Sequence, residues 1–158
     1  MGGGYCVVAS HDLAFAATNA HIGLPEIPRG SFGQFATSLL YHSGIPIKKA
    51  IMMHYTGYNV TGAEADRIGL VSQSFEEAKL EQETLRLATE IATRHPATIA
   101  SAKISGQMGM DLSLSEAMKM DQLVGAWQQA MVDSVGHVDG YLKSQKGGTK
   151  SDYRRPDA

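Results

Sequence analysis

Three consecutive glycines, Gly2, Gly3 and Gly4, lie directly before the mostly apolar run Tyr5–Ala9. Glycine lets a backbone approach a ligand closely and leaves its N–H group free to point at that ligand. Periodicity alone does not decide whether Val7–Ala9 is a short buried helix or a strand. If the run is helical, the positive end of its dipole adds to the N–H groups, and the triplet would suit an oxyanion. A flexible chain start explains the same three glycines equally well.

A second candidate for chemistry is Glu26, in the stretch Gly23-Leu24-Pro25-Glu26-Ile27. Its apolar neighbours could remove water from the carboxylate and so prepare it for proton transfer. A glutamate in a solvated loop is the alternative, and these five residues by themselves favour that alternative.

Other side chains with catalytic or metal-binding chemistry are scattered along the chain. Cys6 could be a nucleophile at a helix start, where a thiolate is favoured, although a small buried apolar side chain is the commoner role. The six histidines show no HExxH motif and no paired ligand spacing, so we expect no metal site. The sequence also contains no G-x-S-x-G motif and no Walker or Rossmann glycine pattern.

The elements that must position these residues change in character near Pro46. Before it, the chain is glycine-rich, and we expect short strands at Asp12–Ala17 and His21–Leu24 and a helix at Phe32–Tyr41. Two prolines exclude a regular helix over Pro25–Gly30, which places Glu26 in an irregular segment.

After Pro46, helical signals dominate, and a first helix is expected to end at Thr56-Gly57. Three capping boxes follow, each with a hydroxyl three residues before a carboxylate: Thr61 with Glu64, Ser74 with Glu77, and Ser113 with Glu116. The second box predicts a long helix that His95-Pro96 stops. The third predicts a helix with an apolar stripe that covers the core or a partner chain, formed by Met120, Val124, Trp127 and Met131.

Composition limits the classes of protein and of partner. The 158 residues are enough for a domain with a real core, and the net charge of -2 comes from scattered charges with no basic stripe for nucleic acid. The single cysteine excludes an internal disulfide and indicates a reducing compartment. No apolar run reaches the roughly 18 residues of a membrane-spanning helix, and no secretory signal is recognisable. We therefore expect a cytoplasmic protein with no nucleic-acid or membrane partner.

The glycine triplet and Glu26 occur in order with a third motif, AEADRIGLV at residues 63–71. The stretch GGGYCVVASHDLAFAATNAHIGLPEIPRG resembles the glycine triplet, helix, strand and acidic loop of the crotonase superfamily, the enoyl-CoA hydratases and isomerases. TGYNVTGAEADRIGLV resembles a later helix of that family and its Gly-Leu-Val signature. The resemblance covers most of residues 1–145. Its motifs are specific for this superfamily when they occur together, and no single one of them is specific.

The resemblance implies an α/β fold, a partial ββα spiral followed by a helical C-terminal region that forms trimers. It also implies an acyl-CoA substrate and no cofactor apart from the coenzyme A within that substrate. Two backbone N–H groups of the family hold the thioester oxygen while an enolate develops, and Gly3 would supply one of them. Glu26 would be the second of the two acid/base carboxylates found in hydratases. The remaining positions expected to bind substrate are Gly2, Gly4, Cys6, Leu24 and Pro25.

Two departures from the family pattern bear on the reaction. The first hydratase carboxylate would fall at Cys6, so water held between two carboxylates is not expected. One glutamate can still move a proton between two carbons of an enolate, which favours isomerase or hydratase-lyase chemistry on Glu26. The family run Pro-Gly-x-Gly-Gly-Thr-Gln-Arg-Leu is also altered, to GQFATSLLY at residues 33–41, and this changes the expected acyl pocket.

A further difference is that a full crotonase domain has another half before its glycine triplet, which supplies the second oxyanion N–H group. We therefore expect a partial crotonase core over residues 1–75, a helical region over 76–146 and a flexible tail over 147–158. The expected assembly is a homotrimer or hexamer, and one arrangement has another chain supply the N-terminal half. The alternative is a non-catalytic assembly module, or a truncated fragment without activity alone.

Overall fold

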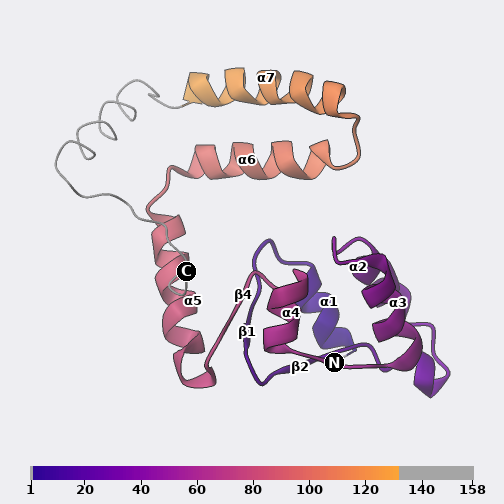
Figure 1. Cartoon of the computed structure of the whole chain (residues 1–158). Helices are drawn as coiled ribbons and strands as arrows, with labels where there is room; N and C mark the ends of the chain where they lie inside the picture. The colour runs from indigo at the N-terminus through magenta and orange to yellow at the C-terminus, as the bar shows by residue number, and fades with distance from the viewer. Residues whose placement is uncertain (1, 132–158) are drawn as a thin grey trace. The chain divides into compact units, whose positions relative to one another are not determined.

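The computed structural model describes residues 2–131 (Figure 1). Residue 1 and residues 132–158, which include the expected tail, lie outside the described part. The described residues form two compact units that divide between Thr89 and Glu90.

The first unit combines short strands with helices. Its elements are α1 (Gly3–Ala9), β1 (Phe15–Ala17), β2 (His21–Ile22), the 3₁₀ helix η1 (Ile27–Arg29), α2 (Gln34–Tyr41), α3 (Ile47–Thr56), β3 (Val60–Thr61), α4 (Gly62–Ile68), β4 (Gln73–Phe75) and α5 (Glu77–Ala92), which continues past the division. β1 pairs in parallel with β4, and β2 pairs antiparallel with β3. The two expected strands and the helix before Pro46 are confirmed, and Val7–Ala9 is helical.

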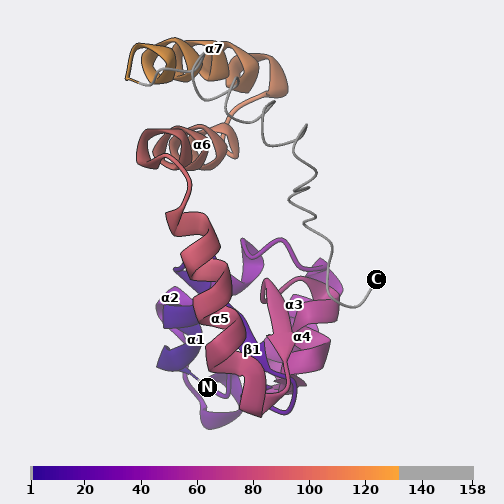
Figure 2. The same ribbon diagram turned by 90° about the vertical axis from the view of Figure 1, so that its left-hand side faces the viewer.

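The second unit contains α6 (Pro96–Gly109) and α7 (Leu114–Met131), which pack side by side (Figure 2). The capping box at the start of α7 is complete. The Ser113 N–H group donates to Glu116 Oε2 at 3.1 Å, and the Glu116 N–H group donates to Ser113 Oγ at 3.4 Å. The Ser113 hydroxyl also donates to Glu116 Oε2, at 2.6 Å, and this bond together with the one from the Ser113 N–H group lowers the pKa of the Glu116 carboxyl. None of the α7 side chains is buried by the described residues, and Trp127 keeps 47% of its surface exposed.

The other two capping boxes have different outcomes. The Glu64 N–H group donates to Thr61 Oγ1 at 3.1 Å, which confirms the first box. The box at Ser74 is wrong, because Ser74 lies in β4 and its N–H and hydroxyl groups both donate to Asp66 Oδ2. Glu77 instead accepts a hydrogen bond of 2.9 Å from Asn19. A carboxylate from α4 therefore accepts the Ser74 N–H group that Glu77 would have accepted in the box.

His95-Pro96 does more than stop a helix. α5 already ends at Ala92, and His95 is the N-cap of α6, where its Nδ1 accepts a hydrogen bond from the Ala97 N–H group at 3.2 Å. Pro96 occupies the first turn, where its missing N–H group costs nothing. The dipeptide therefore starts α6, an element that the sequence did not predict.

The core of the first unit lies between α1, α2, α3 and the strands. Its fully buried large side chains are Tyr5, Leu24, Leu40, Met53 and Val60. Close backbone packing adds to this core, since a Cβ atom at Gly62 would collide with the carbonyl oxygen of Ala17. The first residue of α4 therefore lies directly against β1, and this contact fixes the helix on the strand.

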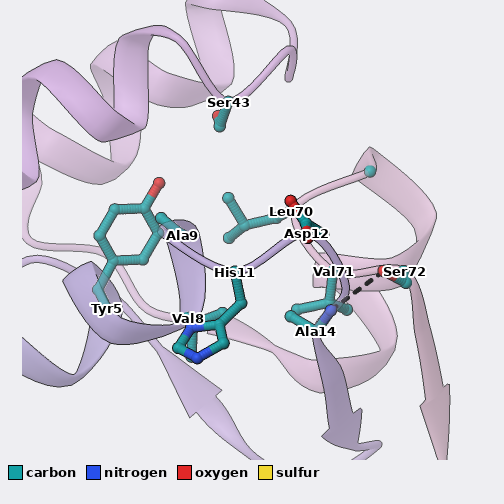
Figure 3. A pocket seen from close by; sticks show the side chains of 11 residues that line it. Tyr5, Val8, Ala9, His11, Asp12, Ala14, Ser43, Leu70, Val71 and Ser72 are labelled. Atoms are coloured by element: carbon teal, nitrogen blue, oxygen red, sulfur yellow. Dashed lines mark hydrogen bonds between the residues drawn. The ribbon is translucent and has the colours of Figure 1, made fainter. Parts of the chain in front are cut away.

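Tyr5 brings a polar atom into this core. Its ring is 1% exposed, and its hydroxyl has no hydrogen-bond partner among the described residues. The ring borders a cavity of about 220 Å³ between α1 and the loops before β1 and β4, and its hydroxyl points toward Ser43 (Figure 3). Burial raises the pKa of Tyr5 to about 12, and the Ser43 hydroxyl opposes this rise without completing a hydrogen bond.

The raised pKa predicts that the protein loses stability at high pH. Above the ordinary value of 10.0, the unfolded chain releases the Tyr5 proton while the native state retains it up to about 12. The free energy of unfolding therefore falls as the pH rises through this window. Tyr5→Phe should remove that component. It should also match or exceed the wild-type stability at neutral pH, by up to roughly 1 kcal/mol, because a buried unpaired hydroxyl is lost.

Urea unfolding of both proteins near pH 7 and near pH 11 measures this difference. All other residues are the same in both proteins, so the comparison isolates Tyr5. A Phe variant that is clearly less stable at neutral pH would show that the hydroxyl has a native partner, and the interpretation would fail.

Candidate functional site

The segment that carries Glu26 is fixed by its own backbone. Glu26 is the N-cap of η1, and its carbonyl oxygen accepts hydrogen bonds from the N–H groups of Arg29 at 3.0 Å and Ser31 at 2.9 Å. Gly30 ends the turn with a φ of 75°, a left-handed conformation that favours glycine. The prolines exclude an α-helix here, as expected, and leave a single 3₁₀ turn.

The Glu26 side chain lies between two glycines. A Cβ atom at Gly2 would come within 2.9 Å of Glu26 Oε1, and a Cβ atom at Gly33 would come within 3.0 Å of Glu26 Cγ. Both glycines also have positive φ angles, 60° at Gly2 and 67° at Gly33. A side chain at either position would be strained and would displace Glu26, so glycine at both places allows the carboxylate to reach the start of α1.

One carboxylate oxygen of Glu26 is left without a partner. Oε2 is buried and accepts no hydrogen bond from any described residue. Burial of an unpaired polar atom costs free energy, and the cost is larger for a carboxylate oxygen than for a neutral group such as the Tyr5 hydroxyl. The partial burial of Glu26 argues against the fully solvated loop glutamate that was the alternative. The unpaired oxygen is available to a substrate.

The glycine triplet forms the start of α1 beside this carboxylate. Gly2 is the N-cap, and its N–H group donates to the carbonyl oxygen of Gly23 at 3.2 Å, which ties the triplet to the Glu26 loop. Gly3 is the first residue of the helix. The first N–H groups of a helix have no acceptor four residues earlier, so the Gly3 N–H group is available to a ligand.

These groups border one cavity of about 360 Å³, which is lined by Gly2, Gly3, Pro25, Glu26, Arg29 and Ser31. Four of the residues expected in the site therefore meet there. Three residues of this region were not predicted from the sequence, Arg29, Ser31 and Gly33. Arg29 follows Glu26 by three residues, and this spacing was the signal that could have identified it.

Three other expected site residues do not line this cavity. Leu24 is 1% exposed and belongs to the hydrophobic core. Cys6 is half-buried and packs against that core, which is the commoner role weighed for it. Gly4 is exposed within α1, and a Cβ atom there would meet nothing within 4 Å.

Residues 2–131 contain neither a metal-binding cluster nor a membrane-spanning helix. No three histidine, cysteine or acidic side chains of this range lie close enough together to hold a metal ion. No helix in the same range is both long and apolar enough to cross a membrane.

The sequences of known proteins match most of this chain. The enoyl-CoA hydratase/isomerase family model matches residues 1–143. (E)-Benzylidenesuccinyl-CoA hydratase of Thauera aromatica is 30% identical over 124 residues, which are 78% of this chain and 48% of that protein. The mitochondrial enoyl-CoA hydratase domain-containing protein 3 of Rattus norvegicus is 31% identical over 134 residues, 85% of this chain and 42% of the relative. The chain thus spans less than half the length of these relatives.

Solved structures match the fold as well. Enoyl-CoA hydratase subunit I of Geobacillus kaustophilus has a TM-score of 0.83 and 28% identity over 90% of this chain and 56% of its own. Human enoyl-CoA hydratase domain-containing protein 3 has a TM-score of 0.84 and 26% identity, with the same coverage of both chains. The expected α/β crotonase fold is confirmed, and the chain belongs to the enoyl-CoA hydratase/isomerase family.

Proposed function

We propose that this chain acts on an acyl-CoA thioester, with Glu26 transferring a proton and the Gly3 N–H group stabilising the enolate oxygen. The observation that carries the proposal is the buried, unpaired Oε2 of Glu26, in a residue that lines one cavity with Gly3. A thioester carbonyl oxygen placed at the Gly3 N–H group would bring the carbons that exchange protons toward this carboxylate.

The chemistry follows from these two groups. When Glu26 takes a proton from a carbon beside the thioester, the electron pair moves onto the carbonyl oxygen and forms an enolate. A backbone donor aimed at that oxygen stabilises the charge without reorganising. Return of the proton to a different carbon moves the double bond and regenerates the carboxylate. Charge and protons balance with Glu26 as the only acid/base.

The absence of a second carboxylate favours isomerase or hydratase-lyase chemistry. Glu26 is the only acidic residue among those that line the cavity. Cys6 occupies the place of the other hydratase carboxylate and packs against the core. A water molecule would thus be activated from one side only, whereas movement of a proton within the substrate needs a single carboxylate.

The second candidate function, a non-catalytic assembly module, is supported by the surface of α6 and α7. Their exposed apolar side chains include Leu114, Leu123 and Met131, which are 78%, 73% and 60% exposed within the described unit. Exposed apolar side chains in such numbers are typical of association surfaces. A homotrimer or hexamer built through these helices remains part of the proposal, as does a partner chain that completes the oxyanion site.

The cytoplasmic location also stays a prediction, since the rat relative is mitochondrial by name.

Replacement of Glu26 tests the catalytic proposal. Glu26→Gln keeps the size of the side chain but cannot accept a proton, so conversion of a 3-enoyl-CoA to the conjugated 2-enoyl-CoA should fall about 100- to 10 000-fold. Affinity for the thioester should stay within about threefold, because binding uses the rest of the cavity. Glu77→Gln is the matched control, since Glu77 bonds to Asn19 outside the cavity, and it should retain full turnover. Retained turnover in Glu26→Gln would refute the assignment.

The oxyanion role can be tested without turnover. Acetoacetyl-CoA bound as its enolate absorbs in the near ultraviolet, so titration of the purified chain should produce a saturable band that coenzyme A alone does not produce. The expected band reports a donor aimed at the enolate oxygen. A folded sample without the band would contradict the catalytic proposal for this chain alone and favour the assembly module.

A further inference from the structure

Arg29 is a cation in the cavity that the proposed reaction does not use. It lines the cavity with Glu26, Gly3 and Ser31, and it is the only basic residue among the lining residues. Its side chain is exposed, and within residues 2–131 it forms no ion pair with a carboxylate. Its charge is therefore available to an anion that enters the cavity.

The 3₁₀ turn explains why Arg29 and Glu26 share a cavity, while the Arg29 side chain is exposed and Oε2 of Glu26 is buried. Glu26 precedes η1 and Arg29 ends it, three residues later. Side chains three residues apart in a 3₁₀ helix lie on the same face, and a rise of about 2.0 Å per residue separates them by about 6 Å along the axis. The hydrogen bond from the Arg29 N–H group to the Glu26 carbonyl oxygen, at 3.0 Å, fixes this spacing.

This spacing suits a substrate that meets both groups at once. Glu26 must lie at the carbon that exchanges its proton, so Arg29 lies beside a more distant part of the same acyl group. A guanidinium stays charged at every physiological pH and binds carboxylates through two parallel N–H donors. The phosphates of coenzyme A are separated from the thioester by the long pantetheine arm, which makes them a poorer match for a residue beside Glu26.

We propose that Arg29 selects acyl-CoA thioesters whose short acyl chain carries a carboxylate. The inference rests on the proposed function and names its substrate class. Arg29 binds the distal carboxylate, and Ser31, which also lines the cavity, offers a hydroxyl donor. An uncharged acyl chain of the same length would leave the guanidinium without an anion.

Binding of two saturated thioesters tests the proposal without any turnover. Glutaryl-CoA ends in a carboxylate, and pentanoyl-CoA has the same carbon count and ends in a methyl group. Isothermal titration of the wild-type chain should give about tenfold tighter binding of glutaryl-CoA. Arg29→Met should abolish that preference and leave the affinity for pentanoyl-CoA unchanged within about twofold. Arg29→Lys should retain part of the preference for glutaryl-CoA, because the lysine keeps the positive charge but lacks the two parallel N–H donors of the guanidinium.

Arg67→Met is the matched control, since Arg67 pairs with Glu64 on α4 outside the cavity, and it should bind both thioesters as the wild type does. Equal binding of both thioesters by the wild type would overturn the proposal about Arg29 and leave the proposed function standing. If Arg29→Met weakened the binding of both thioesters equally, the proposal about Arg29 would also be overturned, and the residue would be assigned to the phosphates of coenzyme A. If a folded wild-type chain bound neither thioester, the proposed function itself would fail.

Discussion

The site depends on one steric constraint, the passage of the Glu26 side chain between two glycine backbones. Cβ atoms at Gly2 and Gly33 would come within 2.9 Å and 3.0 Å of this side chain, and both backbones have positive φ angles. The start of α1, the η1 turn and the start of α2 therefore meet at a single carboxylate. The hydrogen bond from the Gly2 N–H group to the Gly23 carbonyl oxygen also ties the start of α1 to the segment just before Glu26. The position of Glu26 is thus a property of three segments rather than of its own loop.

Local interactions were predictable from the sequence, and interactions between distant segments were not. Gly57 ends α3 in a left-handed conformation, and Thr61 caps α4, because each depends on residues within one helical turn. Ser74 has the same local pattern as Thr61. Its donors nevertheless reach Asp66, which precedes it by eight residues and is brought close by the pairing of β4 with β1. A capping pattern is formed by residues within one helical turn, so it cannot reveal a hydrogen-bond acceptor that comes from another helix.

The same limit applies to the candidate site. The resemblance to the family singled out Glu26 and Gly3 from their order in the sequence, and both residues line one cavity. Leu24 was expected beside them, but its side chain is buried in the hydrophobic core and does not line the cavity. Arg29 was missed for a different reason. The prolines excluded a helix, and with it the periodicity by which residues three apart are assigned to one face.

The proposed oxyanion donor, the Gly3 N–H group, depends on the packing of the helix that carries it. α1 has only seven residues, and Gly3 and Gly4 in its first turn each lower its helical stability by about 1 kcal/mol relative to alanine. A helix of this length does not persist by propensity, so tertiary contacts must hold it. Tyr5 provides them, because full burial of a large side chain contributes roughly 1.5–3 kcal/mol. The glycines at the start of the helix also weaken it, and the buried ring of Tyr5, two residues after Gly3, holds the helix start beside the cavity.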